Sequence, residues 1–414
     1  MFPSQTDVLI VGAGPAGLAA AIELKRLGVR AVAVVDREPE AGGTPRLCHH
    51  TGFGLRDLRR VLSGPAYAQN YRTQAERAGV QIYPATTITA WRGPTHFGYT
   101  SPSGVREVEA RAVLLATGCR ERPRSARLVP GTRPQGIFTT GSLQRFVYEQ
   151  HLPVGRRAVI VGAELVSLSA VLTLQHARVA VPFMLTELPQ PQIYFPFTPA
   201  RWLFAEVLAR TQILPNVRVT QIFGRQRVEG VEITHPATGQ TQLLECDTVV
   251  FTGDWIPEHE LARLGGLVMD VGTRGPQVDA AFRTSRRGVF AAGNLLRGAE
   301  TADTSALEGR RAAYYIQPFL QNGHWPEAGL PLVAERPLSW LYPNALTTPW
   351  PKNIAFRSQK FCDNVHVQVH QGPALLHSQP FRRLIVNETM HLKTDWLSNV
   401  NPNGEPARLS ILNP

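Results

Sequence analysis

Short runs of aliphatic residues recur along most of the chain, and most of them lead into a glycine turn. They lie at residues 8–11, 31–35, 112–118 and 157–161, and a shorter one lies within 284–294. Runs of this length and aliphatic density predict buried strands of parallel sheets.

The residues between and after these runs complete the pattern. Leu307, Ala312 and Ile316 are spaced as one face of a helix, which we expect to begin near Ala302. Strands alternating with helices predict an α/β fold with three layers. Beyond residue 356 the pattern changes to strict alternation of apolar and polar residues, which predicts a small β-rich C-terminal region.

The first aliphatic run leads into a turn in which Gly12, Gly14 and Gly17 have the spacing GxGxxG. In such a turn the first glycine permits the tight bend, the second lets the backbone approach a pyrophosphate, and the third lets helix and strand pack closely. The helix that follows offers free N–H groups and a positive dipole end to an anion. The next strand ends at Asp36, which is placed to hydrogen-bond a ribose. Together these features predict a dinucleotide site.

A second strand–turn–helix unit departs from this pattern where phosphates should bind. In RAVIVGAELVSLSA, residues 157–170, Gly162 keeps the first position, Glu164 replaces the second glycine and Ser167 the third. Two like charges about 4 Å apart repel by roughly 4 kcal/mol at an effective dielectric near 20, which corresponds to roughly a thousandfold loss of affinity. The carboxylate either occupies the anion site itself, which we favour, or turns out to solvent and leaves room for NAD(P)H. Glu187, near the end of the next strand, is the acid that could hold a nicotinamide ribose.

The overall composition narrows the class of protein. At 414 residues the chain is long enough for two or three domains, and its formal net charge of +11 is carried mainly by scattered arginines. Because no basic stripe with interleaved aromatic residues occurs, we expect no nucleic-acid partner.

The cysteines bear on cofactor chemistry and on the compartment. None of the four forms a CxxC or zinc-like spacing, so we expect no metal site. Isolated cysteines, the lack of signal-peptide features and the lack of an apolar run of membrane-spanning length predict a cytoplasmic protein without membrane insertion.

Three segments bring in a resemblance. The turn at 12–17, ATG at 116–118 and GVFAAGN at 288–294, in this order, resemble the FAD-binding set of the pyridine-nucleotide–disulfide oxidoreductase superfamily. Residues 116–144 are similar to the FAD subunits of hydrogen cyanide synthase, opine oxidase and dye-linked proline dehydrogenase, and to NADH-oxidase-like flavoproteins. The resemblance implies two Rossmann-like domains, with the FAD domain split by the nicotinamide domain.

We therefore expect an FAD-binding domain made of 1–150 and 276–325 and an inserted NAD(P)-binding-like domain over 151–275. The stretch 326–355, rich in Pro and Trp, predicts an irregular connector, and 356–414 forms the small β-rich region.

The resemblance implies FAD as the bound cofactor. Asn294 stands where an Asp usually holds the flavin ribityl chain, and its amide keeps hydrogen-bonding capacity without the charge. The helix that begins near Ala302 is expected to stabilise reduced flavin through its dipole, with Asp303 as its N-terminal cap. The residues expected to bind FAD are Gly12, Gly14, Pro15, Ala16, Gly17, Asp36, Arg37, Gly43, Ile88, Thr117, Gly118, Gly293, Asn294, Thr301 and Ala302.

Candidates for catalysis are few. His49 and His50 are the candidate catalytic residues, as proton donors near the flavin, against a purely structural role. Cys48 has no neighbouring cysteine for a dithiol mechanism. It is either a single-cysteine peroxidatic or redox centre or, as we favour, a buried structural residue. The arginines in the run at 119–127, Arg120, Arg122 and Arg124, either grip an acidic substrate or partner or form a solvated surface.

These features predict an FAD-dependent oxidoreductase that passes electrons through the flavin to or from an amine, an amino acid or a similar small-molecule substrate. The alternatives are an NAD(P)H-dependent flavin reductase of the NADH-oxidase kind, and an electron-transfer or scaffold subunit with a degenerate nicotinamide site. A second flavoprotein subunit or a separate electron acceptor is the expected partner, in a homo- or hetero-oligomer.

Overall fold

The computed structural model describes residues 2–327 and 329–412 of the chain. These residues divide into two compact units. The first holds the chain up to Arg46, Thr51–Arg120 and everything from Ile256 onward, and the second holds Leu47–His50 and Glu121–Trp255. The chain enters the second unit within β9 (Cys119–Glu121) and leaves it within β18 (Trp255–Pro257).

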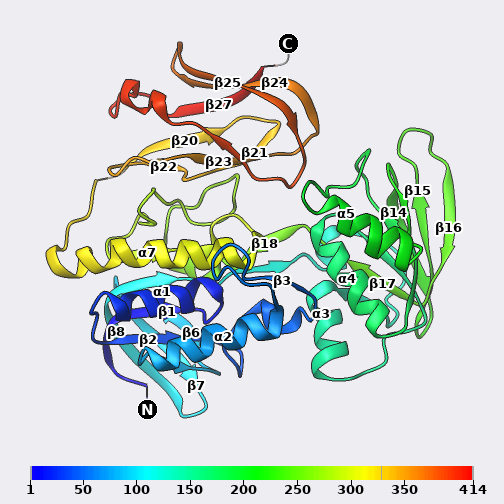
Figure 1. Cartoon of the computed structure of the whole chain (residues 1–414), viewed down its shortest axis with the longest axis horizontal. Helices are drawn as coiled ribbons and strands as arrows, with labels where there is room; N and C mark the ends of the chain where they lie inside the picture. The colour runs from blue at the N-terminus through cyan, green and yellow to red at the C-terminus, as the bar shows by residue number, and fades with distance from the viewer. Residues whose placement is uncertain (1, 328, 413–414) are drawn as a thin grey trace. The chain divides into compact units, whose positions relative to one another are not determined.

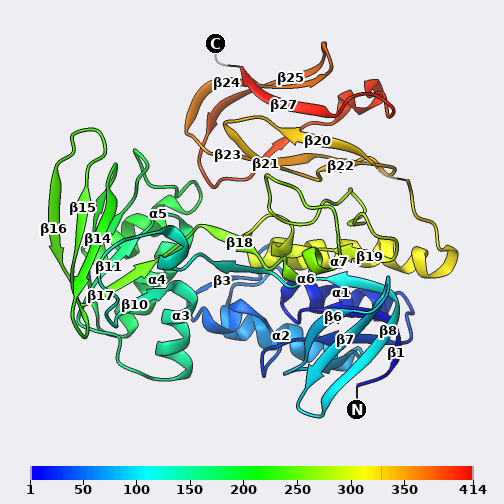
Figure 2. The same cartoon turned by 180° about the vertical axis from the view of Figure 1, so that it is seen from behind.

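A mixed sheet forms the centre of the first unit. Its strands are β1 (Gln5–Val11), β2 (Val32–Val35), β5 (Gln81–Tyr83), β6 (Thr87–Trp91), β7 (His96–Ser101), β8 (Gly104–Leu115) and β19 (Val289–Ala291). The order is β5–β2–β1–β8–β7–β6, with β19 also paired to β8 (Figures 1 and 2). The pairs among β5, β2, β1, β8 and β19 are parallel, whereas β6, β7 and β8 form an antiparallel meander.

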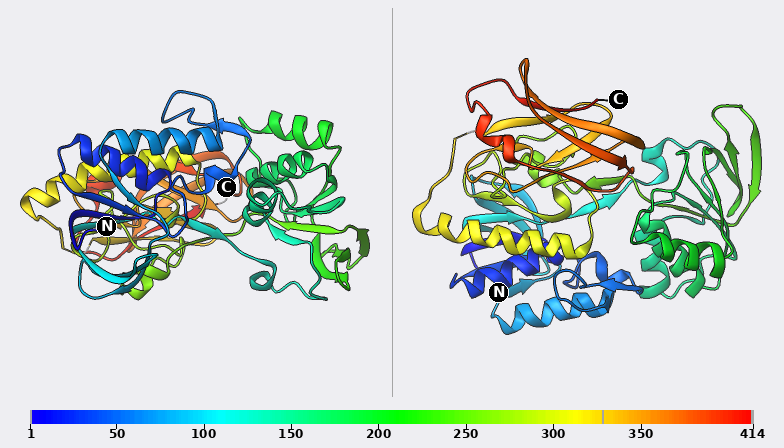
Figure 3. Two further views of the ribbon diagram at one scale, coloured as in Figure 1. Left: turned by 90° about the horizontal axis from the view of Figure 1, so that it is seen from below. Right: turned by 45° about the horizontal axis from the view of Figure 1, so that its top comes forward.

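Helices cover this sheet. The main ones are α1 (Pro15–Arg26), α2 (Gly64–Arg77) and α7 (Ala302–Asn322), with a short α6 (Glu260–Leu264) and a hairpin of β3 (Thr51–Phe53) and β4 (Leu62–Ser63). Figure 3 shows α1 lying beside both α2 and α7. A Cβ on Gly309 of α7 would lie 1.9 Å from the Ala16 carbonyl oxygen, so α1 and α7 are in backbone contact. The predicted start of the last helix near Ala302 is confirmed.

The second unit is built on a fully parallel sheet. Its strands are β10 (Ile137–Thr139), β11 (Arg157–Val161), β12 (Ala180–Leu185), β13 (Gln212–Leu214) and β17 (Thr248–Phe251), in the order β10–β17–β11–β12–β13. A three-stranded antiparallel sheet consists of β14 (Arg218–Gly224), β15 (Val228–Thr234) and β16 (Thr241–Glu245). The helices are α3 (Thr140–Gln144), α4 (Leu165–His176) and α5 (Thr198–Arg201).

Alternate residues of β11 face two separate cores, which shows three layers in the second unit. Ile160 packs in a core with Leu168 of α4. Val159 packs in the opposite core, with Ile222 of β14 and Val231 of β15. Successive side chains of a strand point to opposite faces, so the parallel sheet lies between helices and the small sheet. The predicted three-layer α/β fold with two Rossmann-like domains is confirmed.

The C-terminal region consists of two further sheets around a core of their own. One has the order β22–β20–β27–β24–β25 and the other β21–β23–β26. The strands are β20 (Leu330–Ala334), β21 (Leu338–Tyr342), β22 (Ala345–Leu346), β23 (Ile354–Ser358), β24 (Cys362–Gln371), β25 (Ala374–Leu384), β26 (Met390–Leu392) and β27 (Ala407–Leu412). Val365, Val367 and Val369 are buried, which confirms the predicted alternation.

The remaining regular segments are short helices of other types. Turns of 3-10 helix lie at Thr44–Leu47, Arg124–Arg127, Gly293–Leu295 and Asp395–Asn399, and wider π turns at Arg145–Glu149 and Trp202–Leu208. Among the described residues, no helix combines the length and the apolar character needed to cross a membrane.

Two expectations about the domains differ from the structure. The second unit starts at Glu121 and ends at Trp255, rather than spanning 151–275, because β10 is an edge strand of its sheet, paired with β17. The stretch 326–355 is not an irregular connector, because it contains β20, β21 and β22 and the start of β23. Prolines such as Pro331 and Pro337 obscured apolar positions such as Leu332 and Leu338, which are buried in the core of the C-terminal region.

Candidate functional site

The first dinucleotide turn contains two glycines that close packing requires. Gly12 has a φ of +112°, and a Cβ there would lie 2.3 Å from the Ala116 carbonyl oxygen. A Cβ on Gly17 would lie 1.9 Å from the Gly12 carbonyl oxygen, because α1 lies directly against the turn. No side chain fits at either position.

Gly14 differs from these two glycines because the space above it is open. It is the N-cap of α1, with φ −81° and ψ −172°, and a Cβ there would meet only the Cα of Gly43, at 4.0 Å. Pro15 follows at the start of the helix, a position where its missing N–H removes no hydrogen bond. This backbone cradle at the start of a helix fits a pyrophosphate group.

The carboxyl group of Asp36 reaches from the end of β2 to the same turn. Its oxygens accept hydrogen bonds from Ala13 N at 2.6 Å and from Glu38 N at 2.9 Å. Burial raises the pKa of Asp36, and these two backbone hydrogen bonds oppose the rise. The carboxyl is thereby held where the ribose of a dinucleotide would bind.

Glu258 ties together two segments that are expected to bind FAD. Its carbonyl oxygen accepts a hydrogen bond from the Thr117 hydroxyl at 2.8 Å, and its N–H donates to the Gly118 carbonyl oxygen at 2.9 Å. Its carboxylate pairs with Arg37 at 3.2 Å and with Arg120 at 2.9 Å. Sequence reasoning missed Glu258 because these partners are far from it along the chain, and no local motif marks it.

Asn294 holds the loop that precedes α7. Its side-chain oxygen accepts hydrogen bonds from Glu300 N and from the Ser305 hydroxyl, both at 3.0 Å. Beside it, Gly293 has a φ of +75°, and a Cβ there would lie 2.8 Å from the Cβ of Ala16. The expected contact of Asn294 with a ribityl chain stays a prediction.

The first turn of α7 is capped by Thr301 and not by Asp303. The Thr301 hydroxyl accepts a hydrogen bond from a backbone N–H of that turn at 3.3 Å. Asp303 instead accepts hydrogen bonds from Gly54 N at 2.9 Å and Arg56 N at 2.8 Å. The expectation for Asp303 is therefore wrong, because its partners come from a loop distant in sequence. Asp303 anchors the segment between β3 and β4 to the start of α7.

Ile88 lies in the hydrophobic core of the first unit. It is 8% exposed and faces Tyr99 in the pairing of β6 with β7. A ligand would therefore reach the backbone of Ile88 and not its side chain.

The second turn, in the second unit, repeats the hydrogen-bond plan of the first. Gly162 N donates to the Leu185 carbonyl oxygen at 2.8 Å, just as Gly12 N donates to the Val35 carbonyl oxygen at 2.8 Å. Both bonds connect the turn to the end of the neighbouring parallel strand, so residues of the two turns can be compared position by position.

Glu164 stands at the position of Gly14, and its side chain fills the turn. It is the N-cap of α4, with φ −103° and ψ −179°, and it is 8% exposed. A Cβ on Gly162 would lie 2.8 Å from one of its carboxyl oxygens, and a Cβ on Gly253 would lie 2.9 Å from its carboxyl carbon. The Glu164 side chain therefore does not turn out to solvent. It occupies the space that stays open above Gly14 in the first turn.

Burial dominates the electrostatics of this carboxyl group. It raises the pKa of Glu164, and the hydroxyls of Thr252 and Ser167 and the charge of Arg127 oppose the rise. The Ser167 hydroxyl accepts a hydrogen bond from Glu164 N at 3.2 Å and lies 2.8 Å from the Thr252 hydroxyl. Within the described part of the chain, one carboxyl oxygen of Glu164 has no hydrogen-bond partner. The group thus keeps its proton more readily than an exposed glutamate does.

Asp36, the acidic residue that follows β2 in the first unit, has no acidic counterpart in the second unit. Thr186 stands at the position of Asp36, since each donates its N–H to the next strand of its sheet, over 3.0 Å and 3.1 Å. The Thr186 hydroxyl accepts a hydrogen bond from the Gln192 side chain at 2.8 Å. Glu187 lies one residue further and is exposed. The residues of the first turn fit FAD, whereas those of the second do not fit NAD(P).

The candidate catalytic histidines belong to the second unit, whereas every residue expected to bind FAD belongs to the first. The ring of His49 stacks on that of Tyr148, with centroids 3.8 Å apart. Burial lowers the pKa of His49, and the neighbouring His176 lowers it further. A catalytic role for His49 and His50 stays a prediction.

Cys48 lies next to these histidines and is partly buried. Its sulfur lies 3.8 Å from the side-chain oxygen of Gln144. Burial raises the pKa of the Cys48 thiol to about 12, so the reactive thiolate does not form near neutral pH. This environment fits the structural role expected for Cys48.

The arginines of the run at 119–127 serve internal contacts. Arg124 is 6% exposed and donates to backbone carbonyl groups of its own loop. Arg122 pairs with Asp254 at 2.8 Å. Arg120 pairs with Glu260 at 2.6 Å and lowers the pKa of that carboxyl to about 2. The side chains of Arg120 and Arg122 are 40% and 34% exposed, which agrees with a solvated surface, whereas the buried Arg124 does not. A grip on an acidic substrate or partner stays a prediction.

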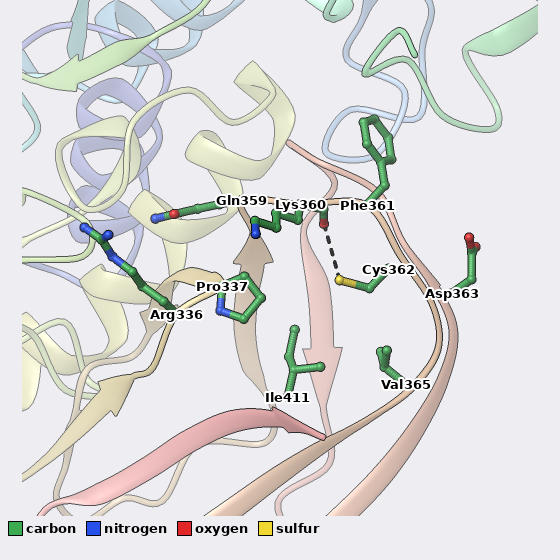
Figure 4. A pocket seen from close by; sticks show the side chains of 9 residues that line it. All are labelled: Arg336, Pro337, Gln359, Lys360, Phe361, Cys362, Asp363, Val365 and Ile411. Carbon is green, nitrogen blue, oxygen red and sulfur yellow. Dashed lines mark hydrogen bonds between the residues drawn. The ribbon is translucent and has the colours of Figure 1, made fainter. Parts of the chain in front are cut away.

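The C-terminal region holds a cavity of about 560 Å³ (Figure 4). Its lining consists of Arg336, Pro337, Gln359, Lys360, Phe361, Cys362, Asp363, Val365 and Ile411. The Cys362 sulfur donates to the Lys360 carbonyl oxygen at 3.8 Å. None of the residues expected to bind FAD lines this cavity.

Known proteins resemble this chain over about three quarters of its length. Residues 6–309 match the family model described as pyridine nucleotide-disulphide oxidoreductase. One subunit of the opine oxidase of Rhizobium meliloti is 29% identical over 338 residues, which are 74% of this chain and 61% of that protein. The corresponding subunit of the opine oxidase of Agrobacterium tumefaciens (strain Ach5) is 30% identical over 339 residues, 74% of this chain and 64% of that protein. The chain thus spans about three fifths of the length of these relatives.

A solved structure shows the same fold. The thioredoxin reductase of T. acidophilum matches 76% of this chain and 99% of its own with a TM-score of 0.64 and 22% identity. Proteins of the matching family are flavin oxidoreductases that bind FAD and NAD(P). Since the family model covers both dinucleotide turns and the start of α7, the chain belongs to the pyridine nucleotide-disulphide oxidoreductase family.

Proposed function

We propose that the chain is an FAD-dependent oxidoreductase that takes electrons from an amine, an amino acid or a similar small metabolite, and not from NAD(P)H. The observation that carries the proposal is the contrast between the open space above Gly14 and the Glu164 side chain that fills the second turn. The similarity to the two opine oxidase proteins supports an amino-acid-derived secondary amine as the substrate class.

The first unit supplies the groups that would hold FAD. The start of α1 at Gly14 would bind the pyrophosphate, and Asp36 would accept hydrogen bonds from the ribose. Asn294 would hold the ribityl chain, and the start of α7 at Thr301 and Ala302 would stabilise negative charge on the pyrimidine edge. When bound, the flavin supplies the chemistry of accepting a hydride from a substrate C–H bond.

Oxidation of an amine also releases a proton, which the chain must accept. His49 is a candidate, because burial lowers its pKa and favours the neutral ring near neutral pH. A neutral imidazole can accept a proton, whereas an imidazolium cannot. His50 is the second candidate on the same segment.

The electrons must then leave the flavin. Since the chain spans about three fifths of relatives that are named as subunits, we propose that a second flavoprotein subunit or a separate acceptor takes them. An NAD(P)H-dependent reductase, the alternative, would require Glu164 to leave the turn in which it is buried.

Anaerobic mixing with candidate substrates tests the proposal. The purified chain, reconstituted with FAD, is mixed with opines and with cyclic or N-alkylated amino acids while the visible absorbance of the flavin is followed. We expect at least one of these compounds to bleach the flavin, and an added dye to restore its colour. If the flavin stays oxidised with all of them and is bleached by NADH, the proposal fails.

A further inference from the structure

A network of buried charges lies where the loop before α7 meets the C-terminal region. Arg297 and Glu308 form an ion pair with side chains that are 4% and 2% exposed. Arg357 of β23 pairs with Glu300 at 2.8 Å, and Arg297 lies 3.6 Å from the same carboxylate. The Thr389 hydroxyl donates to Glu300 at 2.6 Å. Breaking a buried ion pair leaves an uncompensated charge, so these contacts hold Glu300 and Arg357 in place. Among the described residues, two nitrogens of Arg297, Nε and Nη1, have no hydrogen-bond partner.

The C-terminal region supplies half of the network. Arg357 donates to the Thr389 hydroxyl at 3.0 Å and to the Ala299 carbonyl oxygen at 3.1 Å. The Arg297 guanidinium lies 4.2 Å from the ring centroid of Tyr342, within the range of a cation–π contact. Although burial alone would raise the pKa of Glu300, Arg357 and Arg297 lower it overall, so the carboxylate stays ionised.

The other half of the network leads to residues that are expected to bind the flavin. Glu300 N donates to the Asn294 side chain at 3.0 Å, and Glu300 directly precedes Thr301. The Glu308 carboxylate accepts a hydrogen bond from Gly293 N at 3.2 Å. The backbone of residues 293–302 is therefore held from two sides, by α7 and by the C-terminal region.

We propose that Arg357 and Glu300 are positioning residues of the flavin site, through which the C-terminal region holds the loop at 293–302. The inference rests on the proposed FAD binding. It makes the C-terminal region part of the cofactor site, in contrast to a separable module for docking or dimerisation. Neither residue needs to touch the cofactor, because each acts through Asn294 and Thr301.

Removal of the Arg357 charge tests this role. In Arg357→Met the Glu300 carboxylate keeps Arg297 at 3.6 Å but loses its closest cation. We expect the FAD dissociation constant to rise about tenfold or more, which corresponds to about 1.4 kcal/mol, and the flavin spectrum and reduction potential to shift. Arg357→Lys restores the charge and should recover part of the affinity. Arg383→Met is the matched control, because Arg383 is half exposed and pairs with the exposed Asp363 at 3.6 Å in the same region.

Two outcomes overturn the inference. One is a folded Arg357→Met protein with the FAD affinity, spectrum and potential of the wild type. The other is an equal effect of Arg383→Met, which would mean a general loss of stability. Should Arg357→Met not fold, Thr389→Val removes one hydrogen bond to Glu300 without changing any charge, and it must still weaken FAD binding or shift the spectrum. If the wild type itself binds no FAD, the proposed function fails first.

Discussion

The two dinucleotide turns share a backbone plan and differ at the residue that decides whether a phosphate fits. Gly14 and Glu164 have nearly the same backbone angles, with φ −81° and ψ −172° against φ −103° and ψ −179°. Above Gly14 the space is open, whereas the Glu164 carboxyl fills the same space in the second turn. The comparison teaches that the backbone of a Rossmann-like turn can be kept while one side chain fills the space above it.

The Glu164 side chain, which fills the second turn, is enclosed by groups of the second unit itself. A residue at the N-cap can accept hydrogen bonds at a helix start that a phosphate would otherwise accept. Hydroxyls of Ser167 and Thr252 surround Glu164, and Arg127 donates to the carbonyl oxygens of Thr252 and Gly253 at 2.8 Å each. These groups all belong to the second unit, so they enclose Glu164 without a bound nucleotide.

A carboxyl group placed in the first turn should lower FAD affinity, and this is the largest effect that we expect. In Gly14→Glu we expect FAD affinity to fall roughly a thousandfold, from a repulsion of roughly 4 kcal/mol between like charges about 4 Å apart. The dissociation constant of FAD, measured by quenching of flavin fluorescence, checks this. Gly14→Gln has the same bulk without the charge and separates the two causes. Unchanged FAD binding in Gly14→Glu would break the comparison between the turns.

Substitutions at the third position of each turn, Gly17 and Ser167, should have smaller effects, which fall on stability. Gly17→Ala places a methyl group 1.9 Å from the Gly12 carbonyl oxygen, which should cost about 1–3 kcal/mol of stability. Ser167→Ala removes a hydroxyl that contacts Thr252 and Glu164 N, which should cost about 1 kcal/mol. Denaturant unfolding of both variants measures the two losses. A neutral Gly17→Ala would show that close packing does not fix this glycine.

The smallest effect concerns pH. Because burial raises the pKa of Glu164 above its ordinary value of 4.5, the native state holds a proton that the unfolded state releases. The stability linked to this proton is fully present below the unfolded pKa and is lost as pH rises through the native pKa. Glu164→Gln does not titrate at this position. The melting temperature of the variant minus that of the wild type should therefore increase as pH rises from the ordinary glutamate pKa to neutrality. A difference that stays constant over this range would mean that Glu164 is ionised in the fold.

The first turn could be predicted from the sequence because its determinants are local. Gly12, Gly14, Gly17 and Asp36 lie within one strand–turn–helix–strand unit, and each acts on its near neighbours. The unusual position of Glu164 was visible for the same reason. The sequence alone did not decide whether its side chain is buried, because Thr252 and Gly253, which help to enclose it, directly follow β17, much later in the chain.

Long-range partners account for what the sequence did not reveal. Asp303 is of a residue type that often caps helices, but it accepts hydrogen bonds from Gly54 N and Arg56 N. No pattern near α7 indicates these partners. Glu258 and Arg357 have no motif around them, although each holds segments of the candidate flavin site. The prolines between 326 and 355 likewise concealed strands, because the burial that stabilises those strands comes from the rest of the C-terminal region.

An anaerobic titration with NADH and NADPH tests the central claim most directly. It compares the FAD-loaded wild type with Glu164→Gly, and dithionite serves as the control that the flavin can be reduced. The account predicts that neither nucleotide bleaches the wild-type flavin, that dithionite does, and that Glu164→Gly binds ADP-ribose more tightly than the wild type does. Prompt bleaching of the wild-type flavin at low NADH would contradict it, because the second turn would then bind the nucleotide despite Glu164.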